Sequence, residues 1–166
     1  MEAMEDSVIS AGASAVIDRP IEDVFAFASD QQNEPGWHTD VLAIRPAPAS
    51  AGAGGLGSRW LVTVGFFGRN EYEVEVTGIE PNRLVEITTR SGPLRPITTY
   101  AFEPAELGTR LYRQVEIPLE GKSRILKPLL ARVAERRNAR FVENLKNVLE
   151  RRGHSETAHT EGRSAP

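Results

Sequence analysis

The feature that most constrains the fold is an amphipathic stretch near the C-terminal end, which predicts one long helix from about Ser123 to Arg152. The residues before it read mostly as strands. A single helix of that length can cover one face of a curved sheet, and a cavity remains where the two do not close tightly. This arrangement favours a small-molecule container over a catalyst.

Composition narrows the class of protein. The chain has 166 residues, a length that fits one domain, and it contains no cysteine, which excludes disulfides and cysteine-ligated zinc. A formal net charge of -3 does not favour nucleic acid. No apolar run approaches the ~18 residues of a membrane span, and the acidic first residues lack the pattern of a signal peptide. We therefore expect a soluble, cytoplasmic protein with no nucleic-acid partner and no stable membrane insertion; its oligomeric state stays open.

Seven strands and two short helices are predicted before the long helix. Pro20, followed by Glu22 and Asp23, is typical of a first helical turn, and residues 30–37 continue as a second short helix or turn. A loop rich in proline, alanine and glycine occupies residues 46–57. The predicted strands are 8–17, 41–45, 58–67, 69–79, 84–89, 97–103 and 109–117.

The strands alternate in a way that predicts one half-buried antiparallel sheet. In residues 69–79, Tyr72, Val74 and Val76 share one face and three glutamates share the other. Short turns predict antiparallel neighbours, and the two short helices carry the chain from the first strand to the far edge. The predicted fold class is α+β, a bent seven-stranded sheet with the long helix across its concave face. Residues 8–152 form the expected domain, with Gly153 ending the helix and with 1–7 and 153–166 disordered in composition.

This order of elements resembles the START-like (SRPBCC) superfamily and its helix-grip fold, over about residues 8–152. The resemblance is carried by residues 15–30 (AVIDRPIEDVFAFASD), Trp37, residues 100–116 (YAFEPAELGTRLYRQVE) and residues 141–150 (FVENLKNVLE). Within the superfamily the chain is most similar to the polyketide cyclase/dehydrase-like branch. The resemblance implies a deep pocket for a hydrophobic small molecule between the sheet and the C-terminal helix.

Arg137 stands out on the predicted long helix because it falls near the middle of the apolar face. That face comprises Leu126, Leu129, Leu130, Val133, Phe141 and Val148. A desolvated charge needs a partner. Arg137 therefore either anchors a carboxylate, phenolate or carbonyl of a ligand, or pairs with a protein carboxylate, or extends to the cavity mouth. Asn144, close to the same face, is expected to be a structural hydrogen-bonder.

Arg113 is a second polar residue on an apolar face. Leu111, Val115 and Ile117 share its face of the strand, so it points into the concavity. A register shifted by one residue would instead place Tyr112 inside and Arg113 in water.

Aromatic residues supply the rest of the expected cavity wall, although each has an alternative role as core filler. Trp37 follows Pro35-Gly36, a junction where a lid would lie. The full predicted ligand-binding set is Trp37, Tyr72, Tyr100, Phe102, Arg113, Leu130, Val133, Arg137 and Phe141.

Motifs for cofactors and covalent catalysis are missing from the sequence, so we predict no metal or nucleotide cofactor. Residues 52–57 match G-x-G-x-x-G, but they follow a loop and open a strand, unlike a dinucleotide fingerprint. His154 and His159 lack metal-ligating company. His38 is either a general base beside the pocket or, as we expect, a histidine in a surface turn.

Three functions fit these observations. The first is a carrier or sensor that binds one hydrophobic or aromatic small molecule without covalent chemistry. The second is a cyclase, aromatase or dehydratase that moulds a polyketide-like chain in the same pocket. The third is a lipid-handling module that uses Phe66, Phe67 and a basic strip on the long helix at a membrane surface. That strip consists of Arg132, Arg136 and Arg140.

Overall fold

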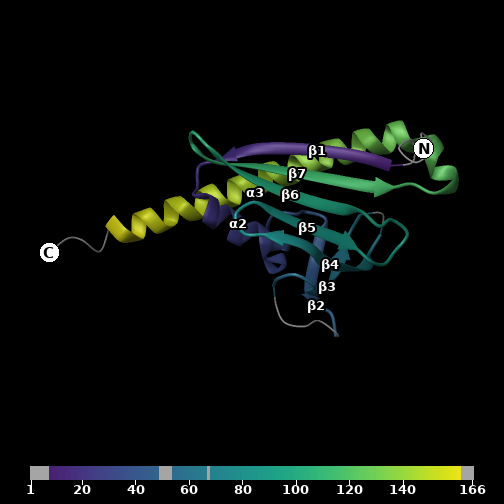
Figure 1. Cartoon of the computed structure of the whole chain (residues 1–166), viewed down its shortest axis with the longest axis horizontal. Coiled ribbons are helices and arrows are strands. Elements are labelled where there is room, and N and C mark those ends of the chain that lie inside the picture. Colours follow the sequence, from purple (N-terminus) through teal and green to yellow (C-terminus); the bar gives the residue numbers. More distant parts are fainter. Residues whose placement is uncertain (1–7, 49–53, 67, 162–166) are drawn as a thin grey trace.

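The computed structural model describes residues 8–48, 54–66 and 68–161. Seven antiparallel strands form one sheet in the order β1-β7-β6-β5-β4-β3-β2, and α3 runs along β1 and continues past the sheet (Figure 1). The strands are β1 (Val8–Ile17), β2 (Val41–Pro46), β3 (Arg59–Val64), β4 (Asn70–Glu80), β5 (Leu84–Thr89), β6 (Ile97–Ala105) and β7 (Gly108–Pro118). The helices are α2 (Ile21–Ser29), η1 (Gln31–Gly36), η2 (Gly121–Leu126) and α3 (Lys127–Glu161).

The predicted fold class is confirmed. β1 and β2 lie at opposite edges of the sheet, and α2 and η1 connect them. α2 follows Pro20 and carries Glu22 and Asp23 in its first turn, where carboxylates complement the helix dipole. The hairpin turn predicted at Phe67 and the loop residues 49–53 lie outside the described residues.

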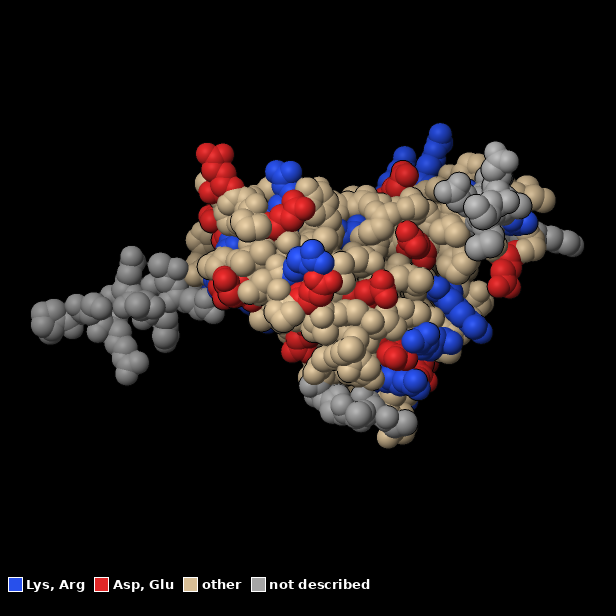
Figure 2. Space-filling view, viewed as in Figure 1, with Lys and Arg blue, Asp and Glu red and all other residues tan. Residues whose placement is uncertain are grey.

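The convex face of the sheet is charged, as the alternation of β4 predicts. Glu71 pairs with Arg45, Glu73 with Arg59, and Glu75 with Arg59 and Arg90. Figure 2 shows acidic and basic side chains interspersed over the visible face of the molecule. Exposed pairs of this kind contribute little stability each, so the fold depends mainly on the opposite, apolar face.

The boundaries of the long helix differ from the prediction. η2 occupies its expected start, and α3 continues through Gly153 to Glu161, so residues 153–161 are helical instead of disordered. A glycine inside a helix costs only about 1 kcal/mol relative to alanine. A Cβ at Gly153 would lie close to the guanidinium of Arg19, the flexible end of a long side chain, so the helix passes Arg19 here instead of ending.

The buried face of α3 is also rotated from its predicted position. Its centre is Asn138 instead of Arg137, while Leu126 and Leu129 are exposed and Leu130 and Val133 are half-buried. The residues that surround Asn138 on the buried face are Phe141, Val142, Leu145 and Leu149. α3 packs chiefly along β1, at the edge of the sheet, and this contact selects a face one residue further along the helix.

Candidate ligand-binding site

Arg113 lies at the centre of a buried polar cluster between the sheet and α3. Strand alternation places Thr109, Leu111 and Arg113 on the concave face, so the predicted register is correct and Tyr112 points outward. The Arg113 side chain is 6% exposed. Its Nε donates a hydrogen bond of 3.1 Å to the phenol oxygen of Tyr100, its neighbour across β6 and β7. Its Nη1 donates to Oδ1 of Asn138.

Asn138 holds this arginine in place. Its Nδ2 donates to the backbone oxygens of Ala11, at 3.0 Å, and Arg113, at 2.9 Å. The single amide therefore connects α3 to β1 and β7 and orients its oxygen toward the guanidinium. Asn138 was missed by the sequence analysis, although the apolar residues Phe141, Val142, Leu145 and Leu149 repeat at helical spacing around it.

Arg113 forms no ion pair with any carboxylate in the described part of the chain, which is unusual for a buried charge. The carboxyl group of Glu34, in η1, interacts electrostatically with Arg113. Burial raises the pKa of Glu34 to about 7, and the positive charge of Arg113 only partly opposes this shift. Near neutral pH, Glu34 therefore exchanges between its neutral and ionised forms beside an arginine that lacks a fixed counter-ion.

His38 is half-buried with its ring packed inward, which differs from our expectation of a histidine in a surface turn. Its ring stacks on Phe141 with centroids 3.8 Å apart, and its Nδ1 is buried without a hydrogen-bond partner among the described residues. Burial lowers the pKa of His38 well below its ordinary value, and the charges of Arg113 and Arg137 add to the effect. The imidazole is therefore neutral and has an unused polar atom in the site.

Aromatic rings enclose the cluster. Trp37 is buried and lies edge-on to Tyr100, with ring centroids 6.3 Å apart. The Nδ2 of Asn144 donates to the backbone oxygen of Trp37, a structural hydrogen bond from α3 to the end of η1. Trp37 is thus part of the packed core at the junction where we expected a lid.

Arg137 lies at the edge of the cluster, beside Phe141. It pairs with Asp40, which is one of the alternatives that the sequence left open, and its guanidinium stacks 3.5 Å from the ring centroid of Phe66. Arg137 belongs to α3, Asp40 directly precedes β2, and Phe66 follows the end of β3. Together they connect three elements above the buried arginine.

The predicted ligand-binding residues are therefore only partly brought together. Trp37, Tyr100, Arg113 and Phe141 cluster, with Arg137 at their edge. Phe102 belongs to the same core but stacks edge-on with Phe25 of α2. Tyr72, Leu130 and Val133 are half-buried, and no contact of theirs with these residues is described.

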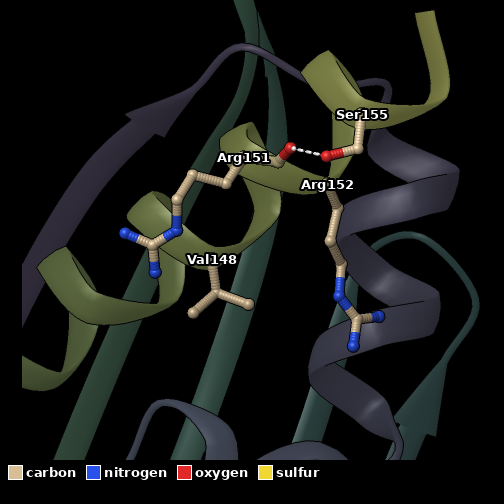
Figure 3. A pocket seen from close by; sticks show the side chains of 4 residues that line it. All are labelled: Val148, Arg151, Arg152 and Ser155. Carbon is tan, nitrogen blue, oxygen red and sulfur yellow. Dashed lines mark hydrogen bonds between the residues drawn. The ribbon is translucent and has the colours of Figure 1, made fainter. Parts of the chain in front are cut away.

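Two hollows open on the surface away from the arginine cluster. One, with a volume of about 470 Å³, lies at the C-terminal part of α3. Figure 3 shows Val148 between the side chains of Arg151 and Arg152, with Ser155 donating to the backbone oxygen of Arg151. The other, of about 340 Å³, includes Asp30 and Ile79 in its wall. No predicted ligand-binding residue lines either hollow.

The described residues contain no group of three or more His, Cys, Asp and Glu side chains that could hold a metal ion. Within the same residues, no helix is both long and apolar enough to cross a membrane.

Solved structures similar to this one share its fold at low sequence identity. The di-domain ARO/CYC protein StfQ of the steffimycin biosynthetic pathway is 12% identical with a TM-score of 0.74, and the match covers 92% of this chain and 54% of StfQ. This chain thus spans about half the length of StfQ. The protein TTHA0849 from Thermus thermophilus is 18% identical, with a TM-score of 0.68, over 84% of this chain and 96% of that one. Ara h 8.0201 is 14% identical, with a TM-score of 0.65, over 86% and 97%.

Comparison with curated proteins finds no match. The family model described as "Polyketide cyclase / dehydrase and lipid transport" matches residues 9–150. This match includes every strand of the sheet and most of α3. The protein with this helix-grip fold and buried arginine cluster therefore belongs to the polyketide cyclase/dehydrase and lipid transport family.

Proposed function

We propose that the protein binds a hydrophobic or aromatic small molecule under α3, with an oxygen of the ligand at the guanidinium of Arg113. The observation that carries this proposal is a buried arginine without a carboxylate partner among the described residues. A carboxylate, phenolate or polarised carbonyl oxygen supplies the missing partner, and a carboxylate also suits the bidentate geometry of a guanidinium.

Two further groups fit an oxygen-bearing ligand. The phenol oxygen of Tyr100 accepts from Arg113, so the phenol hydrogen is free to donate. The unpartnered Nδ1 of His38 supplies another polar contact at the same cluster. The rings of Trp37 and Phe141 contribute apolar surface, which stabilises a buried ligand by roughly 25 cal/mol per Å².

Entry to this site requires the contacts of Arg137 to open. Asp40, Phe66 and Arg137 connect three elements over the cluster, and the ion pair between Asp40 and Arg137 is only partly buried. A partly exposed pair is weak enough to open on the timescale of side-chain and loop motion.

Binding of 1-anilinonaphthalene-8-sulfonate, a fluorescent aromatic anion, tests the proposal. We expect Arg113→Gln to weaken binding about tenfold, since a charge-assisted hydrogen bond is lost. Arg110→Gln, on the outward face of the same strand, is the matched control and leaves binding unchanged. Equal affinity in the two variants, with both folded by circular dichroism, contradicts the site. Native mass spectrometry of the purified protein then identifies any ligand that it retains.

Catalysis of a polyketide cyclisation is a second candidate, favoured by the pKa of Glu34. A carboxyl group with a pKa of about 7 both accepts and donates protons near neutral pH. In an intramolecular aldol step, the ionised Glu34 would take a proton from a methylene carbon, which then bonds to a ketone carbon. Tyr100 would donate its proton to the developing alkoxide.

A poly-β-ketone thioester mimic separates the enzyme from the carrier. An enzyme converts the mimic to a cyclised product of lower mass after water loss, and Glu34→Gln abolishes conversion while dye binding persists. A carrier returns the mimic unchanged, apart from the cyclisation that a no-protein control also shows.

A further inference from the structure

The segment that leads from β7 into α3 exposes three large aliphatic side chains. Ile125 is 82% exposed, Leu126 54% and Leu129 62%. Leu119, just before η2, is buried, so the chain is anchored where this segment begins. Three neighbouring aliphatic residues in water are costly for a monomer and are typical of a contact surface.

A row of arginines continues the same solvent-facing stripe of α3. Arg132, Arg136 and Arg140 follow Leu129 at spacings of three, four and four residues, and all three are exposed. They form no ion pair with any described residue; the exposed Glu135 flanks the row, and Glu143 lies one turn further along the stripe. At 1.5 Å per residue, the stripe from Leu129 to Arg140 extends over roughly 17 Å.

The stripe lies opposite the packed face of α3. The buried residues Asn138, Val142 and Leu145 contact the sheet, which leaves the side with Leu129 and Arg136 facing water. A helix with an apolar end and a basic row on one exposed face has the chemistry of an interfacial helix. Such a helix lies flat, with its aliphatic residues in the headgroup region and its cations at lipid phosphates.

Charge decides between the possible occupants of this surface. A symmetric contact with a second copy offers the three arginines no opposite charge, because the stripe meets itself and its charged residues from Leu129 to Arg140 are all arginines. A nucleic acid would satisfy the arginines but leave Ile125 and Leu129 against phosphates. An anionic bilayer satisfies both parts of the stripe.

We propose that η2 and the first turns of α3 dock on an anionic lipid bilayer, with the aliphatic group in the headgroup region and the arginines at the phosphates. The aliphatic group is Ile125, Leu126 and Leu129, and the basic group is Arg132, Arg136 and Arg140. The proposal does not depend on what binds at Arg113.

Co-sedimentation of the full chain with vesicles tests this surface. Vesicles of phosphatidylcholine with about a third phosphatidylglycerol are compared with pure phosphatidylcholine, at low and high NaCl. We expect pelleting with the anionic vesicles only, and loss of pelleting at high salt. The Debye length, beyond which exposed charges no longer attract each other strongly, is about 10 Å at 0.1 M salt and shorter at higher salt.

Two variants and a matched control assign the binding to the stripe. Ile125→Glu with Leu129→Glu weakens binding by more than about tenfold, because two aliphatic side chains no longer leave water. Arg132→Gln with Arg136→Gln weakens binding to anionic vesicles. Leu107→Glu, at a residue 71% exposed in the turn at the other end of β7, retains binding.

Each remaining outcome overturns the proposal. In one such outcome, the wild-type chain stays in the supernatant with anionic vesicles. In another, the variant with Ile125→Glu and Leu129→Glu pellets as well as the wild type does. A third is a lipid-free dimer, detected by light scattering, that the same two changes convert to a monomer. That result would assign the aliphatic group to self-association.

Discussion

The Nε of Arg113 donates a 3.1 Å hydrogen bond to the phenol oxygen of Tyr100, directly across the β6 and β7 pair. Both side chains are buried, and burial raises the pKa of Tyr100, so the phenol stays protonated. The sheet therefore presents a fixed cation and a hydroxyl donor side by side under α3.

Tyr100→Phe removes the acceptor of this hydrogen bond while it preserves the ring. We expect the free energy of unfolding to fall by about 1–3 kcal/mol, because the Nε of Arg113 is left unsatisfied in the core. Urea denaturation measures the change. Tyr112→Phe, on the outward face of β7, is the control and should stay within about 0.5 kcal/mol of wild type. Equal stabilities of the two variants would contradict the role of the hydrogen bond.

Asn138→Leu tests the amide that connects α3 to β1 and β7. The leucine leaves the backbone oxygens of Ala11 and Arg113 and the guanidinium without their partner. We expect a loss of about 3 kcal/mol in unfolding free energy, measured by denaturant titration. Asn147→Leu, on the exposed face of the same helix, should change stability little. A stable Asn138→Leu protein would mean that the amide is dispensable.

The pH dependence of stability is expected to depend on Glu34 and His38 with opposite signs. The raised pKa of Glu34 contributes stability that is present below pH 4.5 and lost as the pH rises through about 7. The lowered pKa of His38 contributes stability that is present above pH 6.5 and lost as the pH falls. Between these values the folded and unfolded chains bind equal numbers of protons at this pair, so the two slopes of stability against pH cancel.

Single variants separate the pH dependence due to Glu34 from that due to His38. His38→Gln should grow more stable as the pH falls from 8 to 5, by about 3 kcal/mol at most, given the shift of Glu34. Glu34→Gln should instead lose stability over the same range. Urea unfolding at several pH values measures both. The lowered pKa values of Glu75, Glu80 and Glu150 act below pH 4.5 and do not interfere. Parallel curves for the two variants would refute the assignment.

Asp40→Asn should speed ligand exchange. The substitution removes the ion pair that holds Arg137 above the cluster, so stopped-flow dye binding and release should both accelerate several-fold with little change in Kd. Arg45→Gln breaks an exposed pair on the convex face and serves as the control. If the rates of Asp40→Asn and wild type agree, the ligand does not enter past Arg137.

Local sequence patterns determined the elements of this protein. β1 and β5 have the predicted bounds, and alternation in β7 predicted that Arg113 points inward, because strand periodicity depends on neighbouring residues alone. The amphipathic pattern of the C-terminal part of the chain likewise predicted a long helix after the strands. Its predicted end was wrong because α3 continues through Gly153, which lies beside Arg19, a residue distant in sequence.

Only the tertiary structure decided which side of α3 is buried and which groups Arg113 meets. A helix with apolar residues on more than one side has several possible buried faces, and packing along β1 chose the one centred on Asn138. The same packing brought His38 and Glu34, whose segment reads as a polar turn, against the buried cluster. Periodicity describes a segment about its own axis, whereas the rotation of that axis, the partners of a buried charge and the resulting pKa shifts depend on residues that only the folded chain brings together.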